Sequence, residues 1–240
     1  MRRRLSLETS WGLAAATLAA LLTSCQHTSV GPSTAFQRAP AERRAAVGEA
    51  ANVARAGARG KAVVRAIRGG QCECGGLGSA WRGLRIGQVI VEEATLRTGA
   101  ATTVDVWLRQ NGPLLRLLPG TTLEIVGLRF SGAETNRLIE TRLKLHEGRI
   151  LAAVAGLAPG SLYEVETPRG VYRARGTAFV VSAEGWLLVI DGQVERQGAS
   201  GSSLARAGEV LDADSASAKP APPELVAEHK IDLASLLGQP

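Results

Sequence analysis

Few residues of this 240-residue chain have the types and spacing that chemistry requires. The histidines His27, His146 and His229 are far apart, and none belongs to a pair with the spacing of metal ligands. Cys72 and Cys74 could give a metal ion two ligands, whereas structural zinc takes four. No nucleophile elbow and no phosphate-binding loop of a recognised spacing occurs. The sequence therefore predicts no catalytic residue, no metal site and no cofactor.

Glu164 and Glu166 could imitate the carboxylate pair of a glycosidase. They lie on one face of an expected strand, about 7 Å apart by the rise of two residues. Two carboxylates on one strand, however, usually form a solvated face and do not flank a substrate. We therefore expect a protein without enzymatic activity.

Cys72-Glu73-Cys74 would place both thiols on one face of an extended segment. A disulfide between residues two apart is strained because its ring is small. The pair is therefore expected to lie in a loop and to be either oxidised or inert.

Arg175-Gly176-Thr177 could belong to a phosphate loop, an adhesion-type ligand or a backbone bend. A phosphate loop needs a following helix and a Lys-Ser/Thr ending, and an adhesion motif needs an acidic third residue. The bend remains. Gly176 would let the chain turn between two strands, Thr177 would hydrogen-bond locally across the turn, and Phe179 would anchor the core.

The N-terminal residues have the pattern of an export signal. Three arginines precede the apolar run Trp11–Leu22, which is shorter than the roughly 20 residues of a transmembrane helix. The run ends in Leu22-Thr23-Ser24-Cys25, which resembles the lipobox of bacterial lipoprotein signal peptides. The resemblance implies that residues 1–24 are removed and that acyl chains on Cys25 anchor the protein in a membrane. Gln26, in place of Asp, favours the outer membrane.

Composition argues for a modest core with many turns, since aromatic residues make up 4% of the chain and glycines number 28. The formal charge of +6 is scattered along the chain. Nucleic-acid binding would need a clustered basic stripe with stacking aromatics, so we expect no nucleic-acid partner.

Residues 61–198 have the texture of an all-β domain. Short runs rich in Val, Ile, Leu and Thr alternate with turn signals such as Asp191-Gly192. In 162–167, Tyr163 and Val165 alternate with the glutamates, as in a half-buried strand; in 122–128, Leu123, Ile125 and Gly127 are expected on one face. The predicted strands are 62–67, 88–92, 95–97, 103–108, 114–118, 122–128, 141–147, 149–154, 163–167, 171–175, 178–182, 186–190 and 193–197.

The flanking segments differ from this domain in composition. Residues 25–60 begin with a small, polar tether and continue with an Ala/Arg-rich spacer, for which we predict a loose helix or a flexible chain. Residues 199–240 are rich in Pro, Ala and Ser, which predicts a disordered tail with a possible short helix over 231–237.

The order of phrases between residues 62 and 197 resembles a FecR-like domain, the extracytoplasmic sensory domain of ferric-citrate-type regulators. "TLRTGAATTVDVWL" is followed by "GPLLRLLPGTTLEI", "TRLKLHEGRILAAV", "YEVETPRGVYRARGTAFVV" and "LLVIDGQVE". The resemblance implies an all-β fold of many short strands, with a twisted-sheet or solenoid-like character. The residues that match the family pattern are Thr98, Gly99, Thr167, Pro168, Arg175, Gly176, Thr177, Phe179 and Gly192.

In the regulators that the chain resembles, this domain relays a signal from an outer-membrane receptor to a cytosolic anti-sigma segment. Only ten residues precede the short apolar run here, so we do not expect the anti-sigma role. We expect a lipid-anchored protein on the periplasmic face or in the outer membrane of a Gram-negative-type bacterium. It would sense or bind an envelope protein or glycan, with no small-molecule substrate identified. The alternative is a structural envelope lipoprotein without a signalling role.

Overall fold

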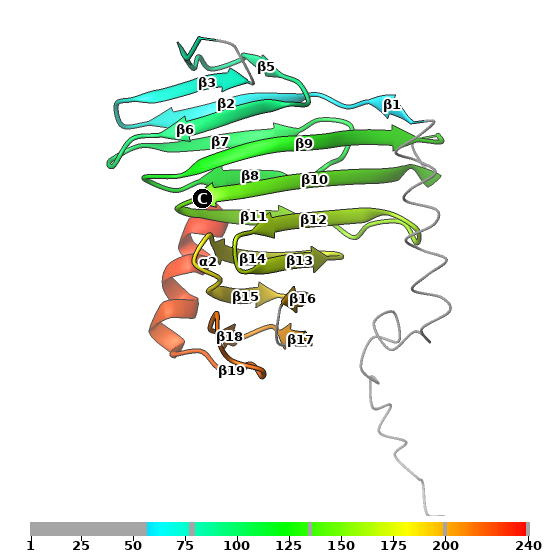
Figure 1. Cartoon of the computed structure of the whole chain (residues 1–240), viewed down its shortest axis with the longest axis vertical. Coiled ribbons are helices and arrows are strands. Elements are labelled where there is room, and N and C mark those ends of the chain that lie inside the picture. Colours follow the sequence, from blue (N-terminus) through cyan, green and yellow to red (C-terminus); the bar gives the residue numbers. More distant parts are fainter. Residues whose placement is uncertain (1–56, 77–79, 134–135, 199–200, 239–240) are drawn as a thin grey trace, which may run out of the picture. The chain divides into compact units, whose positions relative to one another are not determined.

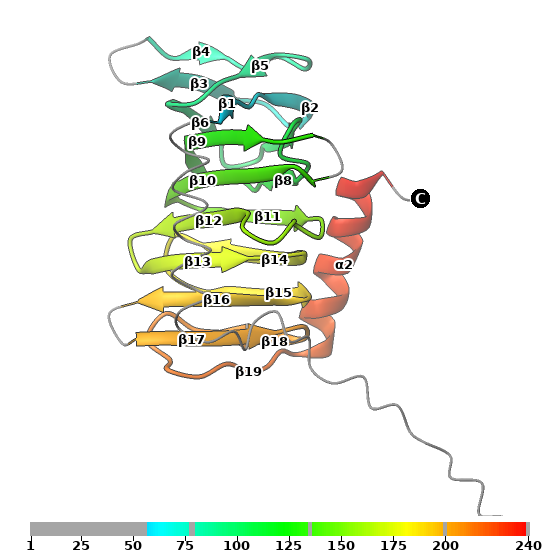
Figure 2. The ribbon, with the colours of Figure 1, turned by 90° about the vertical axis from the view of Figure 1, so that its right-hand side faces the viewer.

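The computed structural model describes residues 57–76, 80–133, 136–198 and 201–238, which form two facing β-sheets and one helix (Figures 1 and 2). Cys25, the export signal and most of the spacer predicted over 25–60 lie outside the described residues. Among those that are described, no helix is long and apolar enough to cross a membrane.

Sheet A has ten strands. Its order is β17 (Gly201–Arg206), β16 (Gln193–Gly198), β13 (Gly170–Ala174), β12 (Leu162–Thr167), β10 (Leu138–Glu147), β9 (Thr122–Ser131), β6 (Ala94–Thr98), β3 (Cys72–Gly76) and β4 (Arg82–Gly83), with β1 (Ala58–Arg59) paired to β9.

Sheet B has nine strands. Its order is β19 (Lys219–Pro220), β18 (Glu209–Leu211), β15 (Leu187–Asp191), β14 (Thr177–Ser182), β11 (Arg149–Val154), β8 (Leu114–Leu117), β7 (Thr103–Leu108), β2 (Ala62–Arg68) and β5 (Val89–Ile90).

The strand order in both sheets follows the sequence closely, so the chain builds the sandwich rung by rung as it passes back and forth between the sheets. Of the strand pairings in the described residues, only that of β10 with β12 is parallel. The prediction of an all-β fold is confirmed, and every predicted strand overlaps an observed one.

The predicted alternation holds in β12, where Tyr163 and Val165 are buried and Glu166 is exposed. In β9 it breaks. Arg142 of β10 lies opposite Gly127, whereas the next residue, Leu143, lies opposite Ile125, so Val126 is an extra residue, a β-bulge. The bulge shifts by one residue which side chains point into the core. Leu128 is therefore buried, whereas the sequence predicted that Gly127 would face inward.

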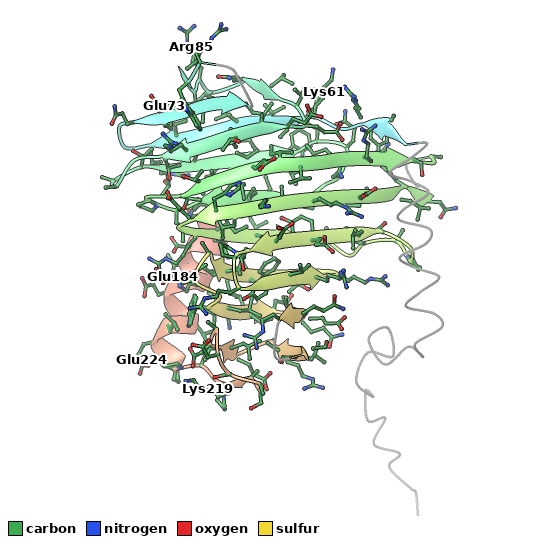
Figure 3. All side chains as sticks on the ribbon, in the orientation of Figure 1. Lys61, Glu73, Arg85, Glu184, Lys219 and Glu224 are labelled. Carbon is green, nitrogen blue, oxygen red and sulfur yellow. The ribbon has the colours of Figure 1, made fainter. Side chains whose placement is uncertain are left out.

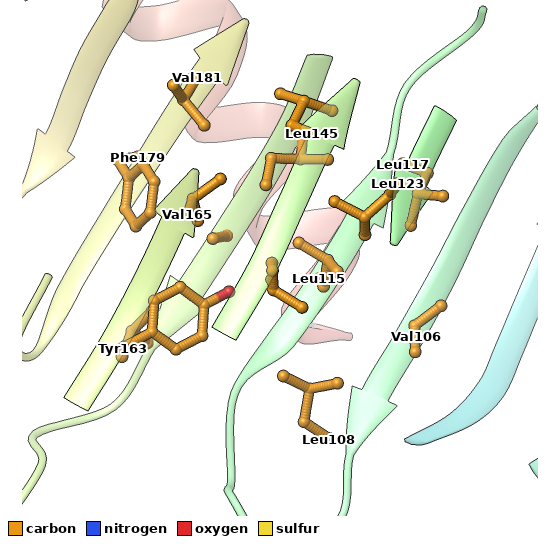
Figure 4. Packing of buried hydrophobic residues seen from close by; sticks show 14 of the residues in the cluster. Val106, Leu108, Leu115, Leu117, Leu123, Leu145, Tyr163, Val165, Phe179 and Val181 are labelled. Carbon is orange, nitrogen blue, oxygen red and sulfur yellow. The ribbon is translucent and has the colours of Figure 1, made fainter. Parts of the chain in front are cut away.

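The core lies between the sheets and combines side chains from both (Figure 4). Its aromatic centre is an edge-to-face pair formed by Tyr163 of sheet A and Phe179 of sheet B, with ring centroids 6.3 Å apart. The Tyr163 hydroxyl is buried without a hydrogen-bond partner, and burial raises the pKa of this phenol far above its ordinary value. An unpaired hydroxyl in a core lowers the stability of the folded state, and burial of the rest of the Tyr163 ring must offset this loss.

The prediction of a disordered tail after residue 198 is wrong for residues 201–238. Strands β17, β18 and β19 extend both sheets, and Ala205 and Leu211 are fully buried in the core between them. Arg196, itself buried, donates hydrogen bonds of 2.8 Å to the carbonyls of Asp212 and Ala213 and so fixes the loop between β18 and β19. Small, polar residues suggested a linker, but these non-local contacts order them.

Helix α2 (Pro223–Leu237) contains the short helix expected over 231–237 and covers the outer face of sheet B (Figure 2). Proline at its first turn and Gly238, with φ +74°, at its C-cap set its ends. Leu236 is buried against an apolar outer surface of β11, β14, β15 and β18, with Leu225, Val226 and Leu233 packed beside it. Burial of this apolar stripe, and not intrinsic propensity, stabilises so short a helix.

A buried arginine also joins α2 to the sheet. Arg116 of β8 forms two hydrogen bonds with the Asp105 carboxylate, of 2.7 and 3.0 Å. Its guanidinium donates a further bond of 3.0 Å to the carbonyl of Asp232 in α2. Arg68 donates to the same Asp105 carboxylate at 2.7 Å. The buried arginine is therefore both paired and hydrogen-bonded, as burial of a charge requires.

The two buried tyrosines give a test of this packing. Replacing Tyr163 by Phe removes an unpaired hydroxyl and should raise the free energy of unfolding by about 1 kcal/mol. The matched change Tyr172→Phe should lower it by about 1 kcal/mol, because the Tyr172 hydroxyl donates a 2.8 Å bond to the carbonyl of Gly185. Urea denaturation of both variants measures the difference; a destabilised Tyr163→Phe protein would contradict the unpaired hydroxyl.

Candidate interaction site

Arg175-Gly176-Thr177 lies where the chain crosses from β13 in sheet A to β14 in sheet B. Gly176 has φ +63°, the left-handed region that favours glycine. The Thr177 hydroxyl does not bond locally across the bend, as expected from the sequence, but donates to the carbonyl of Gln193 at 2.9 Å. Phe179, two residues on, is fully buried.

Gly192 lies at the crossing in the opposite direction, from β15 to β16, and packs directly on the first corner. Its φ is +78°, and a Cβ at this position would lie 2.6 Å from the carbonyl oxygen of Gly176. No real side chain tolerates that distance to a backbone atom, so only glycine allows the two corners to stack. We call this arrangement a Thr–Gly corner. In it, the hydroxyl of a threonine at one crossing forms a hydrogen bond with the backbone next to a glycine at the adjacent crossing.

Two further Thr–Gly corners occur in the described residues. The Thr121 hydroxyl donates to the carbonyl of Arg149 at 2.8 Å, and the intervening glycine, Gly148, has φ +75° with no room for a Cβ. The Thr102 hydroxyl accepts a 3.0 Å bond from the amide of Gly70, beside Gly69 at φ +104°. In each case the threonine is buried, and the pair joins an A-to-B crossing to a B-to-A crossing.

The other residues of the family pattern also lie at turns. The Thr98 hydroxyl donates to the carbonyl of Leu118 at 2.7 Å, and the Gly99 amide donates to the carbonyl of Gln71 at 2.8 Å. The Thr167 hydroxyl closes the β12–β13 turn that contains Pro168, by a 3.1 Å bond to the carbonyl of Gly170. These residues shape the scaffold and do not converge on a pocket.

The residues with potential chemistry are dispersed over the surface. Glu164 pairs with Arg173 at 2.9 Å and Glu166 with Lys144 at 3.1 Å, so the two carboxylates serve separate ion pairs between strands of sheet A. No group of three or more His, Cys, Asp or Glu side chains that could hold a metal ion occurs in the described part of the chain.

The histidines that the structure describes lie far from each other in the fold. His146, at the end of β10, lies 3.0 Å from the Glu124 carboxylate, while His229 is buried in α2 beside the ring of Trp186. His27 lies outside the described residues.

Cys72 and Cys74 lie in strand β3 and not in a loop, because β6 and β4 pair with the segment on both sides. Both thiols are free. Burial raises the pKa of both, so neither has the thiolate character of a reactive cysteine at neutral pH.

The end of the sandwich at β4 and β5 differs from the remainder of the surface. The segment Trp81–Val91, which we call the β5 end, crosses from the edge of sheet A to the edge of sheet B. Leu84 and Ile90 point into the core, whereas four large apolar side chains are exposed. The exposed fractions are 40% for Trp81, 65% for Ile86, 50% for Val89 and 55% for Val91.

The charged groups of the β5 end are all basic. Arg82 and Arg85 are exposed, and the segment holds no Asp or Glu; Figure 3 shows Arg85 projecting beyond the outermost strands. Arg97 of β6 stacks over the Trp81 ring, 4.1 Å from its centroid. The next carboxylate in the sequence, Glu92, is already held by Arg129 at 2.7 Å.

The opposite edge of sheet B is protected. The edge strand β19 consists of Lys219 and Pro220, the residues that natural sheets use to block pairing at an edge. Lys219 is further paired with Asp212 at 2.6 Å. The sequence predicted a strand at 88–92, but the exposure of the β5 end was not expected from it. The available signal was the run Val89-Ile90-Val91, which is apolar on both faces.

The Thr–Gly corners predict a steep cost for filling a glycine. Gly192→Ala should lower the free energy of unfolding by about 2–4 kcal/mol, through a strained φ and a backbone clash. Gly208→Ala is the matched control, since Gly208 has φ +79° but open space where a Cβ would lie, and it should cost about 1 kcal/mol. Chemical denaturation compares the two; equal losses would show that the corners do not stack closely.

Comparison with known proteins finds a family model that matches the central strands. The family model described as FecR protein matches residues 94–195, from β6 to β16. No curated protein sequence matches the chain.

Two solved structures from Parabacteroides distasonis, both described as candidate anti-sigma factors, are similar to the chain. One is 16% identical with a TM-score of 0.45, over 60% of this chain and 75% of that one. The other is 18% identical with a TM-score of 0.43, over 55% of this chain and 62% of that one, which is less than two thirds of its length. What the comparisons show is a match of residues 94–195 to the FecR protein family model.

Proposed function

We propose that this protein is a lipid-anchored, extracytoplasmic binding module that senses or binds a partner in the bacterial cell envelope. The observation that carries the proposal is the FecR family match over residues 94–195, since FecR domains belong to envelope regulators. The matched residues supply the central rungs of both sheets and two of the three Thr–Gly corners.

The absence of enzymatic activity is part of the proposal. It is supported by the ion pairs that occupy Glu164 and Glu166, and by the raised pKa of the Cys72 and Cys74 thiols. Catalysis needs a nucleophile or base, its orienting partner and a place for the reacting atom close together. The described residues bring no such set together.

Lipid anchoring is supported by the sequence Leu22-Thr23-Ser24-Cys25 at the end of a short apolar run. Several acyl chains on one cysteine would hold the protein on a membrane far more firmly than a single chain would. A tether would then separate the β-sandwich from the lipid surface, where it could meet another envelope protein or a glycan.

A structural lipoprotein without a signalling role is the competing hypothesis. It was motivated partly by a Pro-rich, disordered tail, but residues 201–238 are folded onto the sandwich. Deletion of the gene separates the hypotheses. Altered transcription of a neighbouring sigma-factor regulon with intact envelope integrity supports sensing, whereas a weakened envelope with unchanged transcription supports a structural role.

Lipidation is tested by metabolic labelling with radioactive palmitate and membrane fractionation. The wild-type protein should be labelled and membrane-bound, whereas Cys25→Ser should be neither, because only Cys25 has the lipobox context. Cys72→Ser and Cys74→Ser are the controls and should keep the label. Labelled Cys25→Ser protein would refute the proposed anchor.

A further inference from the structure

We propose that the β5 end is a docking edge at which an acidic, extended segment of an envelope protein adds as a further strand to sheet B. The inference rests on the proposed function as a binding module and names the surface and the chemistry of the partner. Its evidence is the pattern of backbone hydrogen bonds, exposed apolar side chains and charge at this end of the sandwich.

The backbone of β5 has one unused side. The Val64 amide donates to the Gln88 carbonyl at 3.0 Å, and Val63 lies opposite Val89. Since consecutive residues of a strand direct their backbone groups to opposite sides, those of Val89 and Val91 point away from β2. β5 is the last strand of sheet B, and no described strand pairs with this side. The edge therefore offers the main-chain groups that strand addition uses.

Side chains at the same edge are apolar where a terminal rung should be polar. In stacked β architectures the outermost repeat carries a polar outer face that keeps the protein soluble. Here Ile86, Val89 and Val91 are at least half exposed on the outermost rung, whereas Trp81 stacks with Arg97 of sheet A. Exposed large apolar side chains that gather in one short segment are typical of an interaction site in a soluble protein. The strand Lys219–Pro220 blocks the opposite edge of the same sheet B.

The positive charge of the β5 end indicates which kind of incoming strand would bind there. Arg82 and Arg85 are exposed in the β5 end without an acidic residue among them, and Arg65 of β2 is exposed next to the edge. Of the acidic residues close to this segment in the sequence, Glu92 is held by Arg129, and Glu93 is exposed. Glu73 of the edge strand pair in sheet A lies directly opposite Arg97 in the β3–β6 ladder. An incoming strand with alternating acidic and apolar side chains would pair its carboxylates with the arginines and cover the valines.

Binding is tested on the full-length protein in detergent with a labelled peptide of alternating glutamate and valine. A photo-reactive amino acid at Val89 should crosslink the peptide. The same group at Val126, which is 43% exposed on the β9 bulge, should not. The double change Arg82→Glu/Arg85→Glu should weaken binding about tenfold or more. Arg206→Glu, at the opposite end of the sandwich, should leave affinity unchanged.

Backbone pairing is tested separately from the side chain. Val89→Pro removes an amide that no described residue uses, at an edge position that tolerates proline, and should abolish binding. Val89→Ala keeps the amide and should retain binding within about threefold. Val91→Pro, which removes the other amide that points away from β2, gives a second variant if the proline at Val89 lowers the melting temperature.

Several results would overturn the docking edge. Equal affinity for a lysine–valine peptide would remove the charge argument, and full binding by Val89→Pro would exclude strand addition. Crosslinks from Val89 to a second copy of the chain, or to its own residues 1–56, would assign the edge to self-association or to intramolecular cover. Binding to anionic phosphatidylglycerol vesicles that Val89→Pro leaves intact would assign the patch to a lipid surface.

Crosslinking in intact cells distinguishes failure of this inference from failure of the proposed function. A protein partner captured from Val126 but not from Val89 would leave the binding module standing and move its site. Capture from neither position, together with an unchanged transcriptional response on deletion, would count against the proposed function itself. Capture at Val89 that is lost in Val89→Pro supports both.

Discussion

The stacking of one chain crossing on the next is the constraint on which this structure depends. At each Thr–Gly corner a buried threonine hydroxyl bonds the backbone beside a glycine that has a positive φ. At Gly192 a Cβ would lie 2.6 Å from the carbonyl of Gly176, so the distance between rungs leaves no room for a side chain. These contacts fix where the chain leaves each sheet, and hence the register of the strands that follow.

The corners hold the successive strands of the two sheets together. The outer faces and the two ends of the sandwich can therefore differ in the side chains that they present. Sheet A carries ion pairs between strands, whereas sheet B is covered by α2 and held to it by the buried Arg116. One edge of sheet B is blocked by Lys219 and Pro220, and its other edge presents an unpaired strand with exposed valines. The FecR pattern residues belong to the scaffold, and specificity for a partner must come from surfaces outside them.

Local sequence patterns predicted the elements well but not their long-range partners. Strands such as 103–108 and 149–154 were predicted with their observed bounds, since their apolar runs end at turn residues. The bond between Thr121 and Arg149 spans 28 residues, and that between Arg116 and Asp232 spans 116. Local periodicity does not encode such long-range contacts. The sequence therefore predicted neither the folded tail nor the bond from the Thr177 hydroxyl to Gln193. Exposure of Val89 depends on β5 being the last strand, which the sequence alone does not specify.

The central claim is that this protein is a corner-stacked β-scaffold with one open edge, and amide hydrogen exchange of the full-length protein tests it most directly. The amides of Val64 and Leu84, which donate to Gln88 and Cys72, should be protected together with the corner amide of Gly70, which donates to the Thr102 hydroxyl. The amides of Val89 and Val91 should exchange almost as fast as in an unfolded chain, because they point away from β2. Protection of Val89 and Val91 equal to that of Val64 would show that the edge is already covered and would contradict the account.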